Sequence, residues 1–295
     1  MRALFDQAVQ NPDQECLDRE TSISSDQEET EQEDFSEENH NIQYVKNGQH
    51  RQTLDLYLPP LNGRRSELTP VVIYIRYDIC MPDNPGALRD FVQSVGEYAL
   101  AFVDYRDDDL PAAVYDCEAA IRWLRAHAAH YKLDPDCFIV WGKCDAGLLA
   151  AILSTTAHLR VFDVGDHLNT SSAVQGVMAY AGPYDIEKLY GRRLPQSQLH
   201  PLEITNGASI SALTSQTPPF LIAHGTDDDV IPLHHSQLLA RALLRAAVPV
   251  VWHSVHRALH MFESITSPQR RALEHSTRAF IHDISARQRP RESLI

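Results

Sequence analysis

One cysteine lies where an apolar strand turns into an apolar helix, a position from which a side chain can do chemistry. The segment Phe138 to Ile152 contains the turn Gly142-Lys-Cys-Asp-Ala146 between these two runs. In the G-x-S-x-G nucleophile elbow, such a turn exposes the nucleophile and aims the next backbone N–H at a developing oxyanion. The pattern therefore predicts Cys144 as a nucleophile and the Asp145 N–H as an oxyanion donor. It also fits a plain strand, turn and core helix, with Cys144 as a packed thiol.

The elements that would position these residues alternate between strands and helices. Order is expected to begin near Ile42, with a hairpin around Asn47-Gly48. Continuous β-branched and aromatic runs predict strands buried on both faces. The expected strands are 53–58, 71–75, 98–105, 137–141, 174–181, 220–224 and 248–253, and the expected helices are 86–95, 111–131, 233–246, 268–286 and the one after Cys144. This alternation predicts an α/β fold with a doubly wound, mostly parallel sheet.

Composition separates an acidic N-terminal segment from a nearly neutral body. Residues 1–40 hold 13 acidic and two basic residues, a net −11 of the total −14, so the remaining 255 residues carry only −3. Residues 1–41 are too poor in large apolar side chains to fold and are predicted to be a disordered tail. Residues 42–295 are predicted to form one domain, with 185–216 as a small cap-like insertion. The neutral body and acidic tail argue against nucleic-acid binding.

The number and spacing of the cysteines and the hydropathy of the chain indicate in which cellular compartment the protein is expected. The five cysteines show no C-x-x-C spacing, and their odd number leaves at least one thiol unpaired, which favours a reducing environment. Polar residues interrupt the N-terminus before a signal-peptide core forms, and no apolar run is long enough to cross a bilayer. We therefore expect a cytoplasmic protein without membrane contact, whose oligomeric state the sequence does not define.

Polar residues follow two later strands, at the sheet edge where open α/β folds bind ligands. Asp228 lies in the run His224-Gly-Thr-Asp-Asp-Asp-Val-Ile-Pro232, and His260 lies in Val255-His-Arg-Ala-Leu-His-Met-Phe262. A thiol, a carboxylate and a histidine in this chain order, each after a strand, follow the nucleophile–acid–base order of α/β-hydrolases.

The chain from about residue 42 to 286 resembles the esterase/lipase branch of the α/β-hydrolase superfamily, near its carboxylesterase, feruloyl-esterase-like and kynurenine-formamidase-like groups. The segments that carry this resemblance are Leu54–Pro59, Val103–Arg106, Asp116–Leu124, Leu133–Asp136, Trp141–Gly142, Ala181–Asp185, His224–Thr226 and His260–Phe262. The family pattern H-G-x-x-D-x-x-V-P implies that the acid is Asp228 rather than Asp227 or Asp229. It also implies that His260 is the base and that His224 is a structural residue at a strand end.

In the implied mechanism, His260 deprotonates Cys144, Asp228 fixes the imidazole tautomer, and an acyl-thioenzyme is hydrolysed. The chain departs from the family at the oxyanion loop, where Arg76-Tyr-Asp-Ile79 replaces the usual His-Gly-Gly-Gly. The Arg76 side chain or the Tyr77 phenol would have to replace the missing donor.

The nucleophile itself is a second departure, because this branch usually has Ser where the chain has Cys144. Dienelactone hydrolases, on the same fold, use a Cys at this position. Lys143 and the helix N-terminus would favour the thiolate, whereas the Asp145 carboxylate opposes it.

We therefore expect a hydrolase of small or medium carboxylic esters, lactones or related acyl compounds, which takes a small-molecule acyl substrate and needs no cofactor. Tyr77 and Tyr184 are candidates for lining the substrate pocket. Two alternatives stay open: a catalytically impaired protein on the same fold that binds a small molecule or a partner, and an isomerase, cyclase or acyltransferase. His253, His256 and His260 span a strand and a loop without a matching acid, so no metal site is expected.

Overall fold

A computed structural model provides the three-dimensional structure. It describes residues 38–59, 68–76, 85–107, 110–157, 162–184, 213–260, 262 and 265–288. The predicted disordered tail therefore lies outside the described residues except for 38–41. Tyr77 and most of the predicted insertion, residues 185–212, also lie outside them.

Eight strands form one sheet in the order β1-β2-β4-β3-β5-β6-β7-β8. Their bounds are β1 Glu38–Gln43, β2 Thr53–Tyr57, β3 Thr69–Ile75, β4 Ala99–Val103, β5 Leu133–Lys143, β6 Gly176–Tyr180, β7 Phe220–Gly225 and β8 Val250–Val255. β2 runs antiparallel to both β1 and β4, and the other neighbouring pairs are parallel. The predicted doubly wound, mostly parallel sheet is confirmed.

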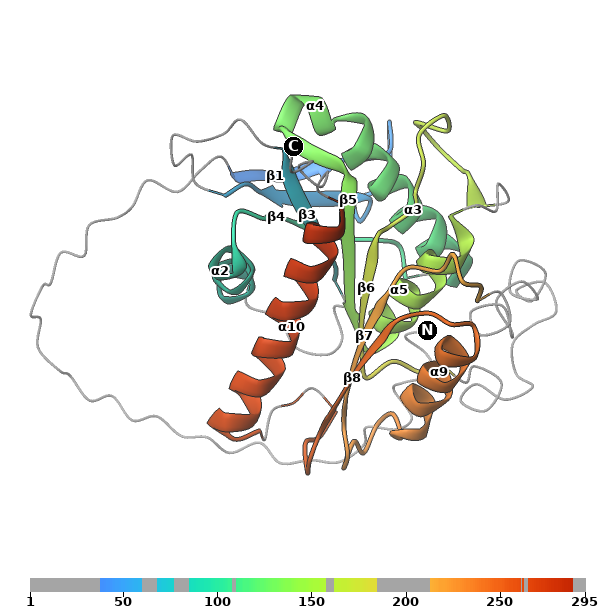
Figure 1. Ribbon diagram of the computed structural model, residues 1–295. Helices are drawn as coiled ribbons and strands as arrows, with labels where there is room; N and C mark the ends of the chain where they lie inside the picture. The colour runs from blue at the N-terminus through green and yellow to red at the C-terminus, as the bar shows by residue number, and fades with distance from the viewer. Residues whose placement is uncertain are drawn as a thin grey trace, which may run out of the picture.

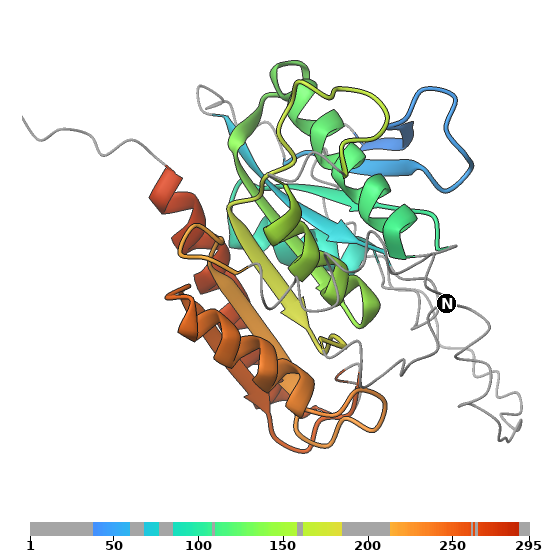
Figure 2. The same ribbon diagram turned by 90° about the vertical axis from the view of Figure 1, so that its right-hand side faces the viewer.

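The helices cover both faces of this sheet. Their bounds are α2 Pro85–Val95, α3 Leu110–Ala126, α4 Ala128–Tyr131, α5 Asp145–Thr156, α9 His234–Arg245 and α10 Ser267–Gln288. Figure 1 shows α2 and α10 on one side of the strands and α3, α5 and α9 on the other. The second face is turned toward the viewer in Figure 2. Both faces of the central strands are therefore buried, which is why these strands are continuously apolar.

Alternate residues of β5 belong to the two halves of the core. Phe138 and Val140 pack with residues of α3 and α5, whereas Ile139 and Trp141 pack with residues of α2 and α10. This is the two-residue period of a strand. It places Lys143, two residues after Trp141, on the α2–α10 face of the sheet, next to the turn that carries Cys144.

Element boundaries differ from the sequence prediction in several places. β1 begins at Glu38, four residues before the expected start of order, because Glu38 pairs with Arg89 of α2 and the strand adds to the edge of β2. The predicted hairpin around Asn47-Gly48 is confirmed, since β1 and β2 pair antiparallel, but residues 44–52 connect them in place of a tight turn, with Asn47 at φ 57°. The helix expected over 111–131 is broken after Ala126 into α3 and α4.

No helix among the described residues is both long and apolar enough to cross a membrane.

Candidate active site

The strained turn at Cys144 is the first feature of the site. Cys144 is the residue before α5 and has φ 53° and ψ −128°, a conformation that residues with a Cβ rarely adopt. Its N–H donates to the carbonyl of Tyr180 in β6 at 2.9 Å, and its carbonyl accepts the Gly147 N–H at 2.9 Å. The neighbouring strand and the first turn of α5 thus hold the backbone of Cys144 on both sides. This is the geometry of a nucleophile elbow.

Two glycines allow the elbow to close. A Cβ added at Gly142 would lie 2.0 Å from the carbonyl oxygen of Ala146, and one added at Gly147 would lie 2.9 Å from the carbonyl oxygen of Tyr180. Ala146 itself accommodates its methyl group in the core. The small residue that the G-x-S-x-G pattern requires after the nucleophile is therefore needed at Gly147, one position later than the pattern places it.

Asp228 is the acid that the structure pairs with a histidine. Its Oδ2 accepts from His260 Nδ1 at 2.8 Å, and its Oδ1 accepts the backbone N–H groups of Val230 at 3.0 Å and Ile231 at 2.7 Å. Its side chain is fully buried. Burial alone would raise the pKa of Asp228, but hydrogen bonds from His224, His260 and Ile231 outweigh it and hold the pKa well below its usual range. Asp228 is therefore ionised at neutral pH.

The two loops that carry Asp228 and His260 are tied together at their bases. The Asp227 N–H donates to the Ala258 carbonyl at 3.1 Å, and the Arg257 N–H donates to Thr226 Oγ1 at 2.7 Å. Gly225 makes the approach possible, because a Cβ there would lie 2.2 Å from the Ala258 carbonyl oxygen. These contacts, formed where neighbouring parallel strands end, bring Asp228 and His260 together. The Asp227 side chain turns away from His260 to accept from the hydroxyl of its neighbour Thr226 at 2.8 Å.

His224 supports the acid. Its Nε2 lies 2.8 Å from the Ile231 carbonyl and 3.0 Å from Asp228 Oδ2, while its Nδ1 lies 2.6 Å from Ser236 Oγ. An Nε2–H tautomer satisfies all three contacts, with the Ser236 hydroxyl donating to Nδ1. The buried ring therefore holds the Asp228 loop, as expected for a structural residue at a strand end.

Of the predicted oxyanion donors, Asp145 lies at the elbow, whereas the Arg76 side chain bonds to other residues. Asp145 is the first residue of α5, so its N–H is among the amides that have no acceptor within the helix. Arg76 follows β3, but its guanidinium bonds to Asp104 at 2.7 Å and pairs with Asp55 at 2.5 Å, and its N–H donates to the Val103 carbonyl. The structure thus directs Arg76 toward β2 and β4, contrary to its expected role as an oxyanion donor.

Two tyrosines lie close to the elbow. Tyr184, predicted to line the substrate pocket, is buried, and a Cβ at Gly147 would come within 3.3 Å of its hydroxyl. It supports the elbow from within the core. Tyr105, which sequence reasoning missed, is also buried, and burial followed by the charges of Cys117 and Asp145 raises its pKa. The only signal in the sequence that could have identified Tyr105 as a neighbour of the site is its position two residues after β4, at the carboxyl end of a strand.

His253 and His260, two of the three histidines that could have formed a metal site, have different hydrogen-bond partners. His253 Nδ1 lies 2.9 Å from Ser276 Oγ on α10, whereas His260 faces Asp228. In the part of the chain that the structure describes, no three His, Cys, Asp or Glu residues are grouped to hold a metal ion.

Known proteins with similar sequences are esterases. The sequence profile of the BD-FAE family matches residues 54–243. Esterase LipQ of Mycobacterium tuberculosis (strain ATCC 25618 / H37Rv) is 27% identical over 191 residues, which are 60% of this chain and 45% of LipQ. The probable isoprenylcysteine alpha-carbonyl methylesterase ICMEL1 of Arabidopsis thaliana is 25% identical over 224 residues, 68% of this chain and 46% of that protein. The chain thus spans about half the length of these curated relatives.

Solved structures with the same fold cover nearly the whole domain. A truncated form of a carbohydrate esterase from gut microbiota superposes with a TM-score of 0.70 at 22% identity, covering 85% of this chain and 97% of the other. The butyrate-bound esterase Est2 of Thermogutta terrifontis gives a TM-score of 0.66 at 18% identity, covering 85% and 95%. These likenesses confirm the α/β-hydrolase fold predicted from the sequence.

Proposed function

The chain belongs to the BD-FAE family, and we propose that it hydrolyses small or medium carboxylic esters or lactones with Cys144 as nucleophile. His260 acts as the base and Asp228 as the acid that orients it. The observation that carries this proposal is the 2.8 Å bond from His260 Nδ1 to the buried, ionised Asp228. This bond fixes the proton on Nδ1 and leaves Nε2 as the basic atom, as a base in such a triad requires.

The proposed reaction has two steps. In the first, His260 Nε2 takes the thiol proton, the sulfur attacks the ester carbonyl, and the Asp145 N–H binds the oxyanion. The tetrahedral intermediate then expels the alcohol, which receives the proton from His260, and leaves an acyl-thioenzyme. In the second step, His260 deprotonates a water molecule, which displaces the thiol and releases the acid. The thiol regains its proton, so the enzyme returns to its starting state.

The experiment that tests this proposal is intact-mass detection of acylated protein during hydrolysis of p-nitrophenyl acetate and p-nitrophenyl butyrate. Wild type should gain one acyl group, and Cys144→Ala should gain none and lose turnover. Cys117→Ala is the matched control: burial, and then the charges of Asp116 and Glu118, raise the pKa of Cys117 and keep it as an unreactive thiol. Full turnover in Cys144→Ala would end the proposal.

A second function, ligand binding without turnover, is favoured by two observations. The Arg76 guanidinium and N–H are both engaged elsewhere, at the position where related enzymes carry glycines of the oxyanion hole. Cys144 is also 0% exposed, so an acyl substrate has to displace the groups that cover the thiol. If wild type is never acylated, yet p-nitrophenyl butyrate analogues with an uncleavable amide raise its melting temperature, this second function replaces the first.

A further inference from the structure

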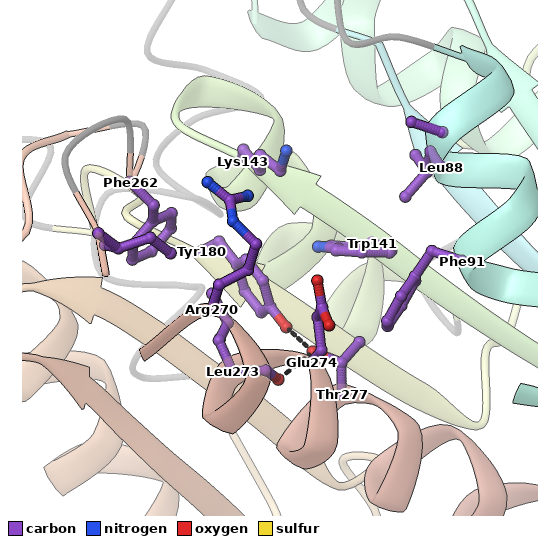
Figure 3. Close-up of a pocket in the computed structure, with 12 residues that line it drawn as sticks. Leu88, Phe91, Trp141, Lys143, Tyr180, Phe262, Arg270, Leu273, Glu274 and Thr277 are labelled. Carbon is purple, nitrogen blue, oxygen red and sulfur yellow. Dashed lines mark hydrogen bonds between the residues drawn. The ribbon is translucent and has the colours of Figure 1, made fainter. Parts of the chain in front are cut away.

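The groove between α2 and α10 has apolar walls that are partly exposed. A cavity of about 290 Å³ lies in it, walled by Leu88 and Phe91 of α2 and by Leu273 of α10 (Figure 3). These three side chains pack against the core but are only half-buried. Ala87 and Arg270, which also line the cavity, are exposed. The groove is therefore open to solvent between the two helices.

Cationic side chains lie along this groove. Arg270 lines the cavity, and Arg278, two turns further along α10, lies with its guanidinium 4.9 Å from the centre of the Phe91 ring. Arg278 also donates to the Ser94 carbonyl of α2 at 2.9 Å, so it lies against both helices. Eight helical residues span ~12 Å, which is the length of the row that the two arginines form. Lys143 of β5 adds a positive charge at the Arg270 end (Figure 3).

These positive charges exceed the negative charge in the cavity wall. Glu274 is the one carboxylate among the described residues that line the cavity. It lies one turn from Arg270 and one turn from Arg278, yet neither arginine is paired with a carboxylate of the part of the chain that the structure describes. The groove is therefore complementary to an extended acidic segment.

The chain itself supplies such a segment beside the groove. Residues 26–37 hold seven acidic residues and no basic one. They directly precede Glu38, whose Oε1 lies 2.6 Å from Arg89 Nη1 of α2. The acidic run is thus attached to the helix that forms one wall of the groove.

The run is long enough to reach across α2. A helix with its side chains is ~10–12 Å wide, and four extended residues span ~13 Å. Residues 34–37 therefore suffice to cross α2 from Glu38. The eight residues before them, 26–33, hold five of the acidic residues. At ~3.3 Å per residue they span ~26 Å, about twice the length of the row formed by Arg270 and Arg278.

We propose that residues 26–33 bind along the α2–α10 groove of their own chain, with their carboxylates beside Arg270, Arg278 and Lys143, and cover the cavity there. Single ion pairs at a protein surface contribute little. The covalent connection offsets this weakness, because it holds the segment near the groove at an effective concentration on the order of millimolar. The contact does not depend on the proposed hydrolysis, and salt weakens it because its charges are exposed.

A photo-crosslinker in the groove tests the contact in the whole chain. Ala87→p-benzoylphenylalanine places it at an exposed residue of the cavity wall. Irradiation should join it to residues 26–33 of the same chain, as peptide mass spectrometry would show. Leu244→p-benzoylphenylalanine is the matched control, 64% exposed on α9 at the other face of the sheet, and should form no such adduct. In 1 M salt, where the screening length is ~3 Å, the Ala87 adduct should fall at least fivefold.

Two variants that each lack four carboxylates separate the acidic run from the charge of the N-terminal segment as a whole. The first removes charge next to the groove and should lower the Ala87 adduct at least fivefold: Glu28→Gln, Glu29→Gln, Glu31→Gln and Glu33→Gln. The second removes the same charge farther from Glu38 and should keep the adduct within twofold: Asp6→Asn, Asp13→Asn, Glu15→Gln and Asp18→Asn.

Substitutions in the groove test the other side of the contact. Arg270→Gln combined with Arg278→Gln should lower the Ala87 adduct at least fivefold. Arg287→Gln removes an arginine from the far end of α10, where it pairs with Asp283 at 2.6 Å, and should keep the adduct within twofold. Melting temperatures show whether each variant is folded.

Peptide competition provides a measurement that needs no crosslinker. A synthetic peptide of residues 26–37 should bind the first of the fourfold variants at least threefold more tightly than wild type in calorimetric titration at low salt, because the wild-type groove is already occupied. The proposal is overturned if Ala87 forms no adduct or one that joins two chains, if the adduct yields at Ala87 and Leu244 are equal, or if the peptide binds both proteins equally.

Discussion

Asp228→Asn is the substitution that tests the site most directly. An amide has one acceptor where the carboxylate has two, and Asp228 uses both of its oxygens. Oδ1 accepts from Val230 and Ile231, and Oδ2 accepts from His260 and from His224. The asparagine must therefore leave one pair of donors facing its NH₂ group.

The structure decides which pair of donors loses its acceptor. If the amide NH₂ faced the backbone, the buried N–H of Ile231 would be unpaired, at a cost of about 1–3 kcal/mol. If the NH₂ faces the histidines, His224 still donates to the Ile231 carbonyl at 2.8 Å, and only His260 loses its acceptor. The second orientation is therefore favoured. The NH₂ then donates to His260 Nδ1 and moves the imidazole proton to Nε2, which can no longer take a proton from Cys144.

We expect kcat for p-nitrophenyl butyrate to fall about 10³-fold at pH 7. The matching replacement in the Ser-His-Asp triad costs about 10⁴ in kcat, and a thiol, being more acidic than a hydroxyl, depends less on its base. The loss should shrink as the pH rises toward about 9, because more of the thiol is then ionised without His260. The assay is the pH profile of kcat, with melting temperatures to exclude unfolding.

Asp229→Asn is the matched control, because Asp229 is the exposed neighbour in the same acidic run. It should keep kcat within about twofold. The reasoning is refuted if Asp228→Asn keeps more than a third of the wild-type rate at pH 7, or if Asp229→Asn is the more damaging change.

Three further substitutions test the elbow, the ion pairs of Arg76 and the buried carboxyl group of Glu118. Gly142→Ala should destabilise by about 3 kcal/mol or more in urea unfolding, because its methyl meets the Ala146 carbonyl oxygen at 2.0 Å; a loss below 1 kcal/mol would contradict the elbow geometry. Arg76→Met should lower the unfolding free energy by about 1–3 kcal/mol and kcat no more than threefold, whereas a hundredfold loss of kcat would restore Arg76 as an oxyanion donor. Burial raises the pKa of Glu118 from near 4.5 to about 7, so the folded state binds more protons between these values, and stability should fall as pH rises through them. Glu118→Gln should flatten that fall, by up to about 3 kcal/mol, in unfolding curves recorded from pH 4 to 8; an unchanged slope would show that Glu118 does not titrate there.

Much of the fold could be predicted because its strands are buried on both faces. A run such as Val71 to Ile75 has no polar side to obscure its identity, and strand–helix alternation then leaves little choice of topology. The pairing of Asp228 with His260 was also predictable, since both follow strands and the resemblance to the family pattern that begins at His224 implies one acid of three. The roles of Cys144 and Asp145 stay predictions until acylation is measured.

The features that sequence reasoning missed depend on partners far apart in the chain. Arg76 was expected to face an oxyanion, but its partners Asp55 and Asp104 are on β2 and just after β4, which only the sheet order brings beside it. The cavity between the sheet, α2 and α10 (Figure 3) likewise joins Trp141 to Glu274, residues on elements that are distant in sequence. No local pattern marks either arrangement.

The position of α10 in the chain has a consequence for how the protein is made. This helix follows every strand of the sheet, yet Phe280, Ile281 and Ile284 pack against one face of it, with Ile284 3.0 Å from where a Cβ on Gly176 would lie. While the ribosome is still translating residues 267–288, α2 is the only one of the described helices that covers that face, so the apolar side chains beneath α10 remain open to solvent or to a chaperone. Damage to this late segment should therefore reduce the yield of folded protein more than it alters the catalytic rate of the molecules that do fold.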